Sequence, residues 1–102
     1  MVLPLLIAIG AVIIGMAVFH LVLLNWSRIK DWFSQRQALA LSNKNNVAFT
    51  LQERLKNGNY STVQGIFNQK TNTLLDGQKY ESEEIGKKLA KRHRNESLVL
   101  YS

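Results

Sequence analysis

The chain has 102 residues and no cysteine, which excludes disulfides, thiolate metal sites and thiol catalysis. Thirteen Lys and Arg against seven Asp and Glu give a formal net charge of +6 at pH 7, and every one of these charged residues follows Leu24. The roughly 80 residues after Leu24 suffice for one small domain with a marginal core.

The stretch Val2 to Leu24 contains no Lys, Arg, Asp or Glu. A helix crosses the core of a bilayer with about 20 apolar residues, so we predict a transmembrane helix over residues 1–24. A secretory signal peptide would need a basic start and a cleavage site, which this stretch lacks. Basic residues follow the span closely and none precedes it. We therefore expect a single-pass membrane protein with its C-terminal domain in the cytoplasm, or in the stroma of a plastid.

Within this stretch, Ala8, Ala11 and Gly15 form a strip of small side chains that favours packing against a second transmembrane helix. Small residues are also common in any span, so lipid contact is the alternative. His20 is the one ionisable side chain of the stretch. We interpret it as a histidine at the membrane interface. A haem or pigment ligand and a hydrogen bond to a partner helix are the alternatives.

Residues 25–41 read as an amphipathic helical extension of the span, without Gly or Pro to interrupt it. We expect Trp26, Arg28, Lys30 and Trp32 to anchor it at the membrane interface. An ordinary helix end with long cationic side chains is the alternative. The polar run at 42–46 then breaks the pattern and predicts a linker.

Residues 47–102 predict a small basic α+β domain. Over 47–57 a short helix at 51–57 is favoured, and a strand entering a hairpin through Asn57-Gly58 is the alternative. Further on, the pattern predicts strands at 60–68 and 73–80, a helix at 82–94 that Ser82 caps, and a strand at 97–101. A right-handed crossover would complete a ββαβ unit. The expected core residues are Val63, Ile66, Phe67, Leu74, Leu75, Ile85, Leu89, Leu98 and Leu100.

No catalytic, cofactor-binding or metal-ligating motif is present, so we expect neither an enzyme nor a bound cofactor. The most concentrated chemistry is a basic patch near the end of the last helix, formed by Lys87, Lys88, Lys91, Arg92 and Arg94. A solvated helix end whose cations complement the helix dipole is the simplest interpretation. Contact with anionic lipid headgroups or an acidic partner is the next. Nucleic acid is disfavoured, because no aromatic residue is interleaved with these cations.

The sequence thus predicts a membrane protein with one N-terminal transmembrane α-helix and a small ββαβ-like domain. Its expected role is that of a non-catalytic accessory or assembly subunit, with other membrane-protein subunits as partners. The alternative is a membrane-tethered binding module that recognises an anionic ligand, lipid headgroups or a soluble regulator.

Overall fold

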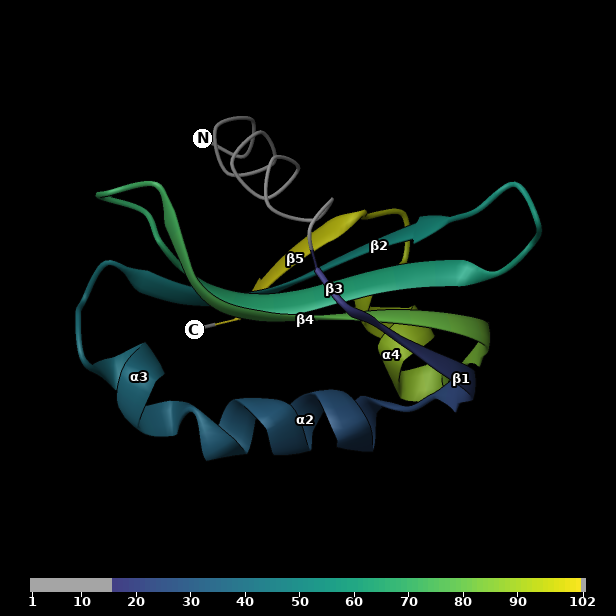
Figure 1. The fold of residues 1–102 in the computed structure, drawn as a ribbon, viewed down its shortest axis with the longest axis horizontal. Helices are drawn as coiled ribbons and strands as arrows, with labels where there is room; N and C mark the ends of the chain where they lie inside the picture. Colours follow the sequence, from purple (N-terminus) through teal and green to yellow (C-terminus); the bar gives the residue numbers. More distant parts are fainter. Residues whose placement is uncertain (1–15, 102) are drawn as a thin grey trace.

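A computed structural model describes residues 16–101 of the chain. Within them, the strands form one mixed sheet with the order β1-β4-β3-β2-β5 (Figure 1). The chain order is β1 (Val18–Leu24), α2 (Trp26–Gln35), α3 (Gln37–Leu41), β2 (Asn46–Arg54), β3 (Tyr60–Asn68), β4 (Thr73–Ile85), α4 (Lys87–Arg92) and β5 (Leu98–Tyr101). Strands β2, β3 and β4 make an antiparallel meander; β1 runs parallel to β4 at one edge, and β5 runs antiparallel to β2 at the other.

The predicted transmembrane helix is wrong. Its last seven residues, Val18–Leu24, form strand β1, which pairs with β4 from Lys79 to Ile85. Among residues 16–101, no helix is long and apolar enough to cross a membrane. The predicted single-pass topology, the cytoplasmic or stromal placement and the membrane-protein fold class depended on this helix and are corrected with it. Ala8, Ala11 and Gly15 lie outside the described residues.

The error has a physical cause. A run of apolar, partly β-branched residues is read equally well as a buried strand or as part of a helix, because continuous apolarity carries no period. The sequence of β1, VFHLVLL, directly follows other apolar residues. The whole apolar run therefore has the length of a transmembrane helix, and the strand could not be told apart from the residues before it. What decides its conformation is hydrogen bonding to β4, a partner more than fifty positions later in the chain.

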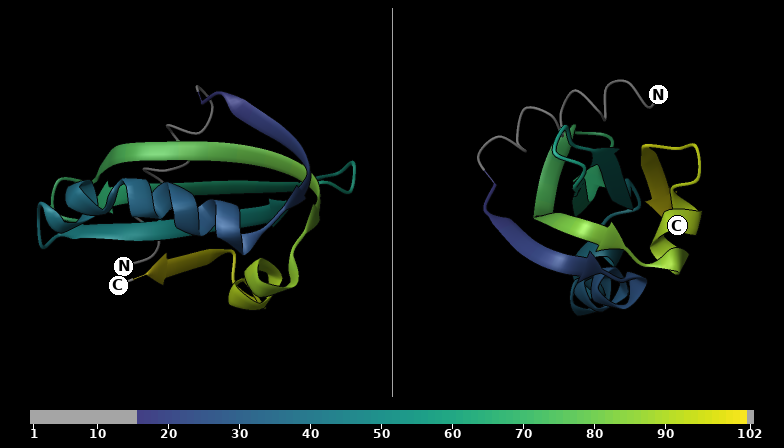
Figure 2. Two further views of the ribbon diagram at one scale, coloured as in Figure 1. Left: turned by 90° about the horizontal axis from the view of Figure 1, so that it is seen from below. Right: turned by 90° about the vertical axis from the view of Figure 1, so that its right-hand side faces the viewer.

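The predicted helical extension over 25–41 is present as α2 and α3, but it begins after a strand instead of continuing a span. Its backbone leaves the helical region at Arg36, which separates the two helices. Helix α2 runs along the strands and covers one face of the sheet (Figures 1 and 2). Ile29 and Trp32, three positions apart on one side of α2, are its buried residues.

Residues 46–54 form strand β2, so the favoured helix at 51–57 is wrong and the hairpin alternative is right. The turn contains Gly58 at φ +91°, a left-handed conformation that glycine adopts without strain. The Asn57 side chain accepts a hydrogen bond from the backbone N–H of Asn59 at 2.9 Å, as in an Asx turn. Alternating apolar residues and pairing on both sides of β2 outweigh the local helix signals.

The predicted hairpin of β3 and β4 is confirmed. Strand β4, however, extends to Ile85, so Ser82 lies in the strand and caps no helix. The helix that follows is shortened to α4, after Gly86. The last strand, β5, pairs antiparallel with β2 on the far side of the sheet, and the predicted crossover beside β4 and the ββαβ unit are therefore wrong.

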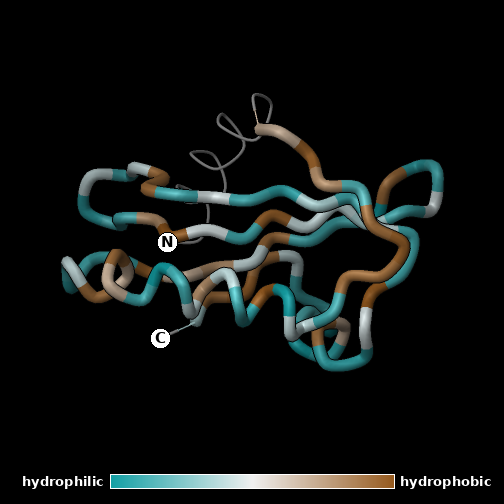
Figure 3. The backbone as a smooth tube through the Cα atoms, turned by 60° about the horizontal axis from the view of Figure 1, so that its bottom comes forward, coloured by the Kyte–Doolittle hydropathy of each residue, from teal (hydrophilic) through white to brown (hydrophobic). Residues whose placement is uncertain are grey.

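The sheet buries apolar side chains on both faces. On the α2 side, Leu24, Ile29, Tyr80 and Leu89 form one buried cluster. The other face holds the cluster of Phe49, Val63 and Phe67. Hydrophobic and hydrophilic residues are interspersed along the long strands (Figure 3), and in β3 residues of both kinds are buried. Because successive side chains of a strand point to opposite faces, both faces of the sheet are covered at β3. Of the expected core residues, Val63, Ile66, Phe67 and Leu89 are buried, Leu74, Ile85 and Leu98 are half-buried, and Leu75 and Leu100 are exposed.

Candidate anion-binding groove

The parallel pairing of β1 and β4 brings the starts of two helices together. Leu24 at the end of β1 lies opposite Ile85 at the end of β4, and the chain enters a helix within two residues of each. The backbone N–H of Gly86 donates a hydrogen bond to the carbonyl oxygen of Leu24 at 2.8 Å. The first turns of α2 and α4, about sixty positions apart in the sequence, are therefore neighbours at the end of the sheet where β1 and β4 stop (Figure 1).

A basic groove runs between these two helices around Trp26. It consists of two hollows of about 470 and 520 Å³, which share Trp26, Lys30 and Lys88. The cations that line it are Lys30 from α2 and Lys87, Lys88, Lys91 and Arg92 from α4. Their side chains are exposed, and Asp31 is the one acidic residue that lines either hollow. Among residues 16–101 the one ion pair within 4.0 Å is Arg36–Asp76, so no carboxylate neutralises a cation of the groove at contact distance.

Aromatic stacking fixes the position of one cation in the groove. The Arg92 guanidinium lies 3.8 Å from the centre of the Trp26 ring and 6.0 Å from that of Tyr101. The Trp26 and Tyr101 rings are themselves 5.6 Å apart, centre to centre. Stacking holds a guanidinium by its face and leaves its N–H groups free to bind a carboxylate or phosphate. Arg92 is therefore held ready for an anion before any ligand arrives.

A buried hydrogen-bond network fastens the end of α4 to the sheet. His93 Nε2 lies 2.6 Å from Thr50 Oγ1, which lies 2.7 Å from the Tyr101 hydroxyl. His93 Nδ1 lies 3.0 Å from the carbonyl oxygen of Glu96, which can only accept. In the neutral ring Nδ1 is thus the donor, and Nε2 accepts from Thr50, which in turn accepts from Tyr101. Burial of the ring lowers the pKa of His93 and so favours this neutral form.

The pair Thr50–His93 has the spacing of a nucleophile and its base, but its surroundings are those of a structural contact. The Thr50 side chain is 0% exposed and lies between His93, at the end of α4, and the Tyr101 side chain of β5, so no substrate can reach its hydroxyl. The network instead joins α4 to β2 and β5. Because α4 carries four of the five cations of the groove, the network holds the groove in shape.

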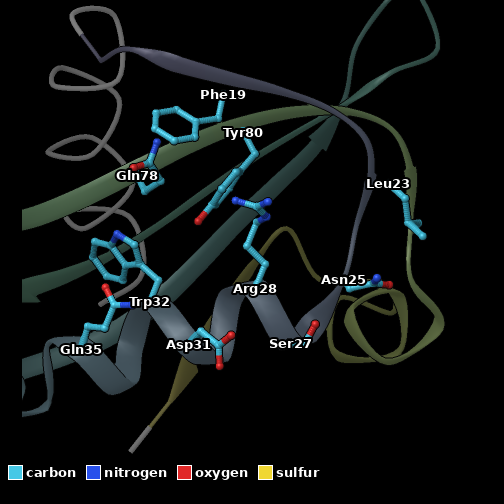
Figure 4. A pocket seen from close by; sticks show the side chains of 10 residues that line it. All are labelled: Phe19, Leu23, Asn25, Ser27, Arg28, Asp31, Trp32, Gln35, Gln78 and Tyr80. Carbon is cyan, nitrogen blue, oxygen red and sulfur yellow. The ribbon is translucent and has the colours of Figure 1, made fainter.

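The structure unites residues that the sequence had assigned to different roles. Trp26 and Lys30, predicted as membrane anchors, lie with Lys87, Lys88, Lys91 and Arg92 of the predicted basic patch. Arg94 follows α4 and lines neither hollow. Arg28 and Trp32 project from the opposite side of α2 into a separate pocket (Figure 4). His20 is an exposed residue of β1, opposite Glu81.

Sequence reasoning missed the part that aromatic residues play here. Trp26 lies sixty-six positions before Arg92, and the interleaving of aromatic and basic side chains appears only when the chain is folded.

The described residues contain no group of three or more His, Cys, Asp or Glu side chains arranged to hold a metal ion. Comparison with protein families, with curated proteins and with solved structures finds no match to this chain.

Proposed function

We propose that the chain is a non-catalytic interaction module that binds the acidic surface of a partner protein in the groove between α2 and α4. The observation that carries the proposal is the convergence of five cations from two helices around Trp26 without an ion pair at contact distance. Mutual repulsion among unpaired cations costs free energy, and a ligand that brings carboxylates recovers it.

The form of the groove favours a surface over a small molecule. Its two hollows are open and adjoin one another, so they present cations over an extended area. The four lysines are point charges on flexible stems, which adapt to carboxylates in varied positions. Only Arg92 is held in place, which supplies one oriented contact within an otherwise adaptable surface. Such binding is fast, of modest affinity and strongly weakened by salt.

Titration of the ¹⁵N-labelled full chain with poly-L-glutamate tests this proposal. Trp26 and Trp32 are the two tryptophans of the chain, and they lie at different sites. We expect the indole N–H signal of Trp26 to shift with saturation, and the signal of Trp32 to move less. The shift should shrink as salt is raised from about 0.05 M to 0.5 M, because screening shortens the reach of the cations to a few ångströms.

Paired charge variants separate the groove from the net charge. The variant K88Q/K91Q removes two cations of the groove, whereas K44Q/K70Q removes two exposed lysines that line neither of its hollows. We expect K88Q/K91Q to weaken poly-L-glutamate binding about tenfold or more, and K44Q/K70Q to weaken it at most about twofold. Equal losses in both variants would show a non-specific charge effect and contradict the proposal. If oligothymidylate binds more tightly than poly-L-glutamate and K88Q/K91Q weakens its binding in the same way, the ligand of the groove is a nucleic acid and not an acidic protein.

A second candidate role, that of an accessory subunit within a larger assembly, is supported by strand β1. This edge strand exposes 49% of Phe19, 64% of Val22 and 45% of Leu23, and it carries no charged residue that would discourage pairing. Large apolar side chains grouped on an edge are typical of surfaces that contact other chains. Affinity purification of the full chain followed by native mass spectrometry tests this role. A stoichiometric hetero-complex is expected, and a lone monomer would contradict it.

A further inference from the structure

A second pocket lies on the opposite flank of α2 from the basic groove. Residues two positions apart on a helix project roughly 200° apart, so Arg28 points away from Lys30 and Trp26. The pocket has a volume of about 580 Å³ and lies between α2 and strands β1 and β4. Figure 4 shows Phe19 and Tyr80 above it, Trp32 beside it and Arg28 extending from the helix toward the Tyr80 ring.

Three aromatic side chains form the walls of this pocket, and contacts elsewhere hold two of them. The rings of Phe19 and Tyr80 meet edge to face, with their centres 6.4 Å apart. The Tyr80 hydroxyl donates a hydrogen bond to Gln64, which donates in turn to the carbonyl oxygen of Ile29 at 3.0 Å. The Arg36 guanidinium covers Trp32 at 3.9 Å. The Tyr80 and Trp32 walls are thus fixed without a ligand, which lowers the entropic cost of binding.

Arg28 is the cation of this pocket. Its side chain is exposed, and among residues 16–101 the Arg28 guanidinium takes part in no hydrogen bond or ion pair. Burial raises the pKa of Tyr80, and the positive charge of Arg28 opposes that rise, which agrees with the approach of the guanidinium to the ring. A guanidinium with free N–H groups beside aromatic walls is suited to a carboxylate attached to a flat apolar group.

We propose that this pocket binds a small aromatic carboxylate, with its ring among Phe19, Trp32 and Tyr80 and its carboxylate on Arg28. The amides of Gln35 and Gln78 also line the pocket, at its end away from Arg28 (Figure 4). Asp31 also lines the pocket, so the charged residues there sum to zero. Asp31 repels any anion in the pocket, and it repels a dianion about twice as strongly as a carboxylate, so a ligand with one negative charge is favoured over a phosphate dianion. The pocket shares Asn25, Ser27 and Asp31 with one hollow of the basic groove, but its cation and its aromatic walls are other residues, so this proposal does not rest on the function proposed for the groove.

The test uses the ¹⁵N-labelled full chain and 3-phenylpropionate as the probe. We expect a saturable shift of the Trp32 indole N–H signal and of the Gln35 and Gln78 side-chain amide signals, while the Trp26 signal stays in place. The neutral isostere 3-phenylpropionamide should bind at least about tenfold more weakly, because a hydrogen bond to a charged group is worth more than one between neutral groups. The dianion phenyl phosphate should also bind more weakly than the carboxylate.

Two variants on the same helix make the result specific. The variant R28Q should weaken 3-phenylpropionate binding about tenfold or more, and K30Q, which removes the same charge on the opposite flank, should leave it unchanged. R28Q should retain poly-L-glutamate binding, so failure at the pocket and failure at the groove are distinguishable. The proposal is overturned if no saturable shift occurs, if the amide binds as well as the carboxylate, or if R28Q and K30Q behave alike.

Discussion

Replacing Thr50 by Val tests how the helix that carries most of the groove's cations is held. Valine has nearly the shape of threonine, so the change removes the hydroxyl without opening a cavity. The His93 Nε2 atom, 2.6 Å from that hydroxyl, then loses its donor in a buried position, and the Tyr101 hydroxyl loses its acceptor at 2.7 Å. Tyr101 is half-buried and can turn to water, whereas His93 is almost fully buried and cannot.

The expected loss follows from that difference. A buried polar atom left without a partner costs roughly 1–3 kcal/mol, so T50V should lower the free energy of unfolding by about 2 kcal/mol. For a domain of this size, 1 kcal/mol corresponds to roughly 4–8 °C in Tm, so a decrease of about 10 °C is expected. Urea unfolding followed by circular dichroism measures the free energy, and differential scanning calorimetry measures Tm.

Thr73 supplies the matched control. It is an exposed threonine at the start of β4, with a single hydrogen bond of 3.3 Å to the backbone. T73V should change the free energy of unfolding by less than about 0.5 kcal/mol. If T50V and T73V have equally small effects, the hydroxyl of Thr50 does not connect α4 to the sheet and the reasoning is refuted.

Three further predictions follow from single contacts. Burial lowers the pKa of His93 below 6.5, so the contribution of the neutral ring to stability is complete above about pH 6.5 and is lost as the pH falls through the folded pKa. Urea midpoints measured from pH 7 to 5 should show this decrease in stability. The variant H93Q should make the decrease smaller. A Cβ at Gly65 would lie 2.8 Å from the Phe49 ring, so G65A should lower the free energy of unfolding by about 1–3 kcal/mol in urea, and a change below about 0.5 kcal/mol would contradict the close packing. W26L should weaken poly-L-glutamate binding severalfold by releasing Arg92, as measured by calorimetric titration, and unchanged affinity would show that the stacking has no part in binding.

Local signals sufficed where neighbouring segments pair with one another. The strand limits of β3, the start of β4 and the turn between them could be predicted, because a hairpin needs only alternating apolar residues and turn residues at its tip. The helix over residues 26–35 was likewise predictable from the spacing of Ile29 and Phe33. Neither element requires knowledge of a distant partner.

Long-range pairing explains the failures. Ser82 has the chemistry of a helix cap, yet it lies in β4 opposite Tyr60 on one side and Leu21 on the other. Those two pairings extend the strand past the local helix start. Strand β1 could not be predicted for the same reason. A continuous apolar run fits a strand or a helix, and its pairing with a distant strand, here β4, decides between them.

The site could be predicted only in part, for the same reason. The cations of α4 lie within six positions of one another in the sequence, so they could be predicted as a basic patch. Their aromatic support was not found, because Trp26 joins them only through the parallel pairing of β1 with β4. The contact between His93 and Thr50 could not be predicted, because the two residues are 43 positions apart and Thr50 gives no signal of its own in the sequence.

The central claim is that the starts of α2 and α4 meet and form the groove, and one spectrum tests it most directly. In a nuclear Overhauser experiment on the full chain, the indole ring protons of Trp26 should show cross-peaks to the side chain of Arg92, whose guanidinium lies 3.8 Å from the ring centre. Cross-peaks between these two residues are the result that the account predicts. Their absence, with both side chains assigned, would mean that the two helices do not meet, and the groove and the function proposed for it would fail together.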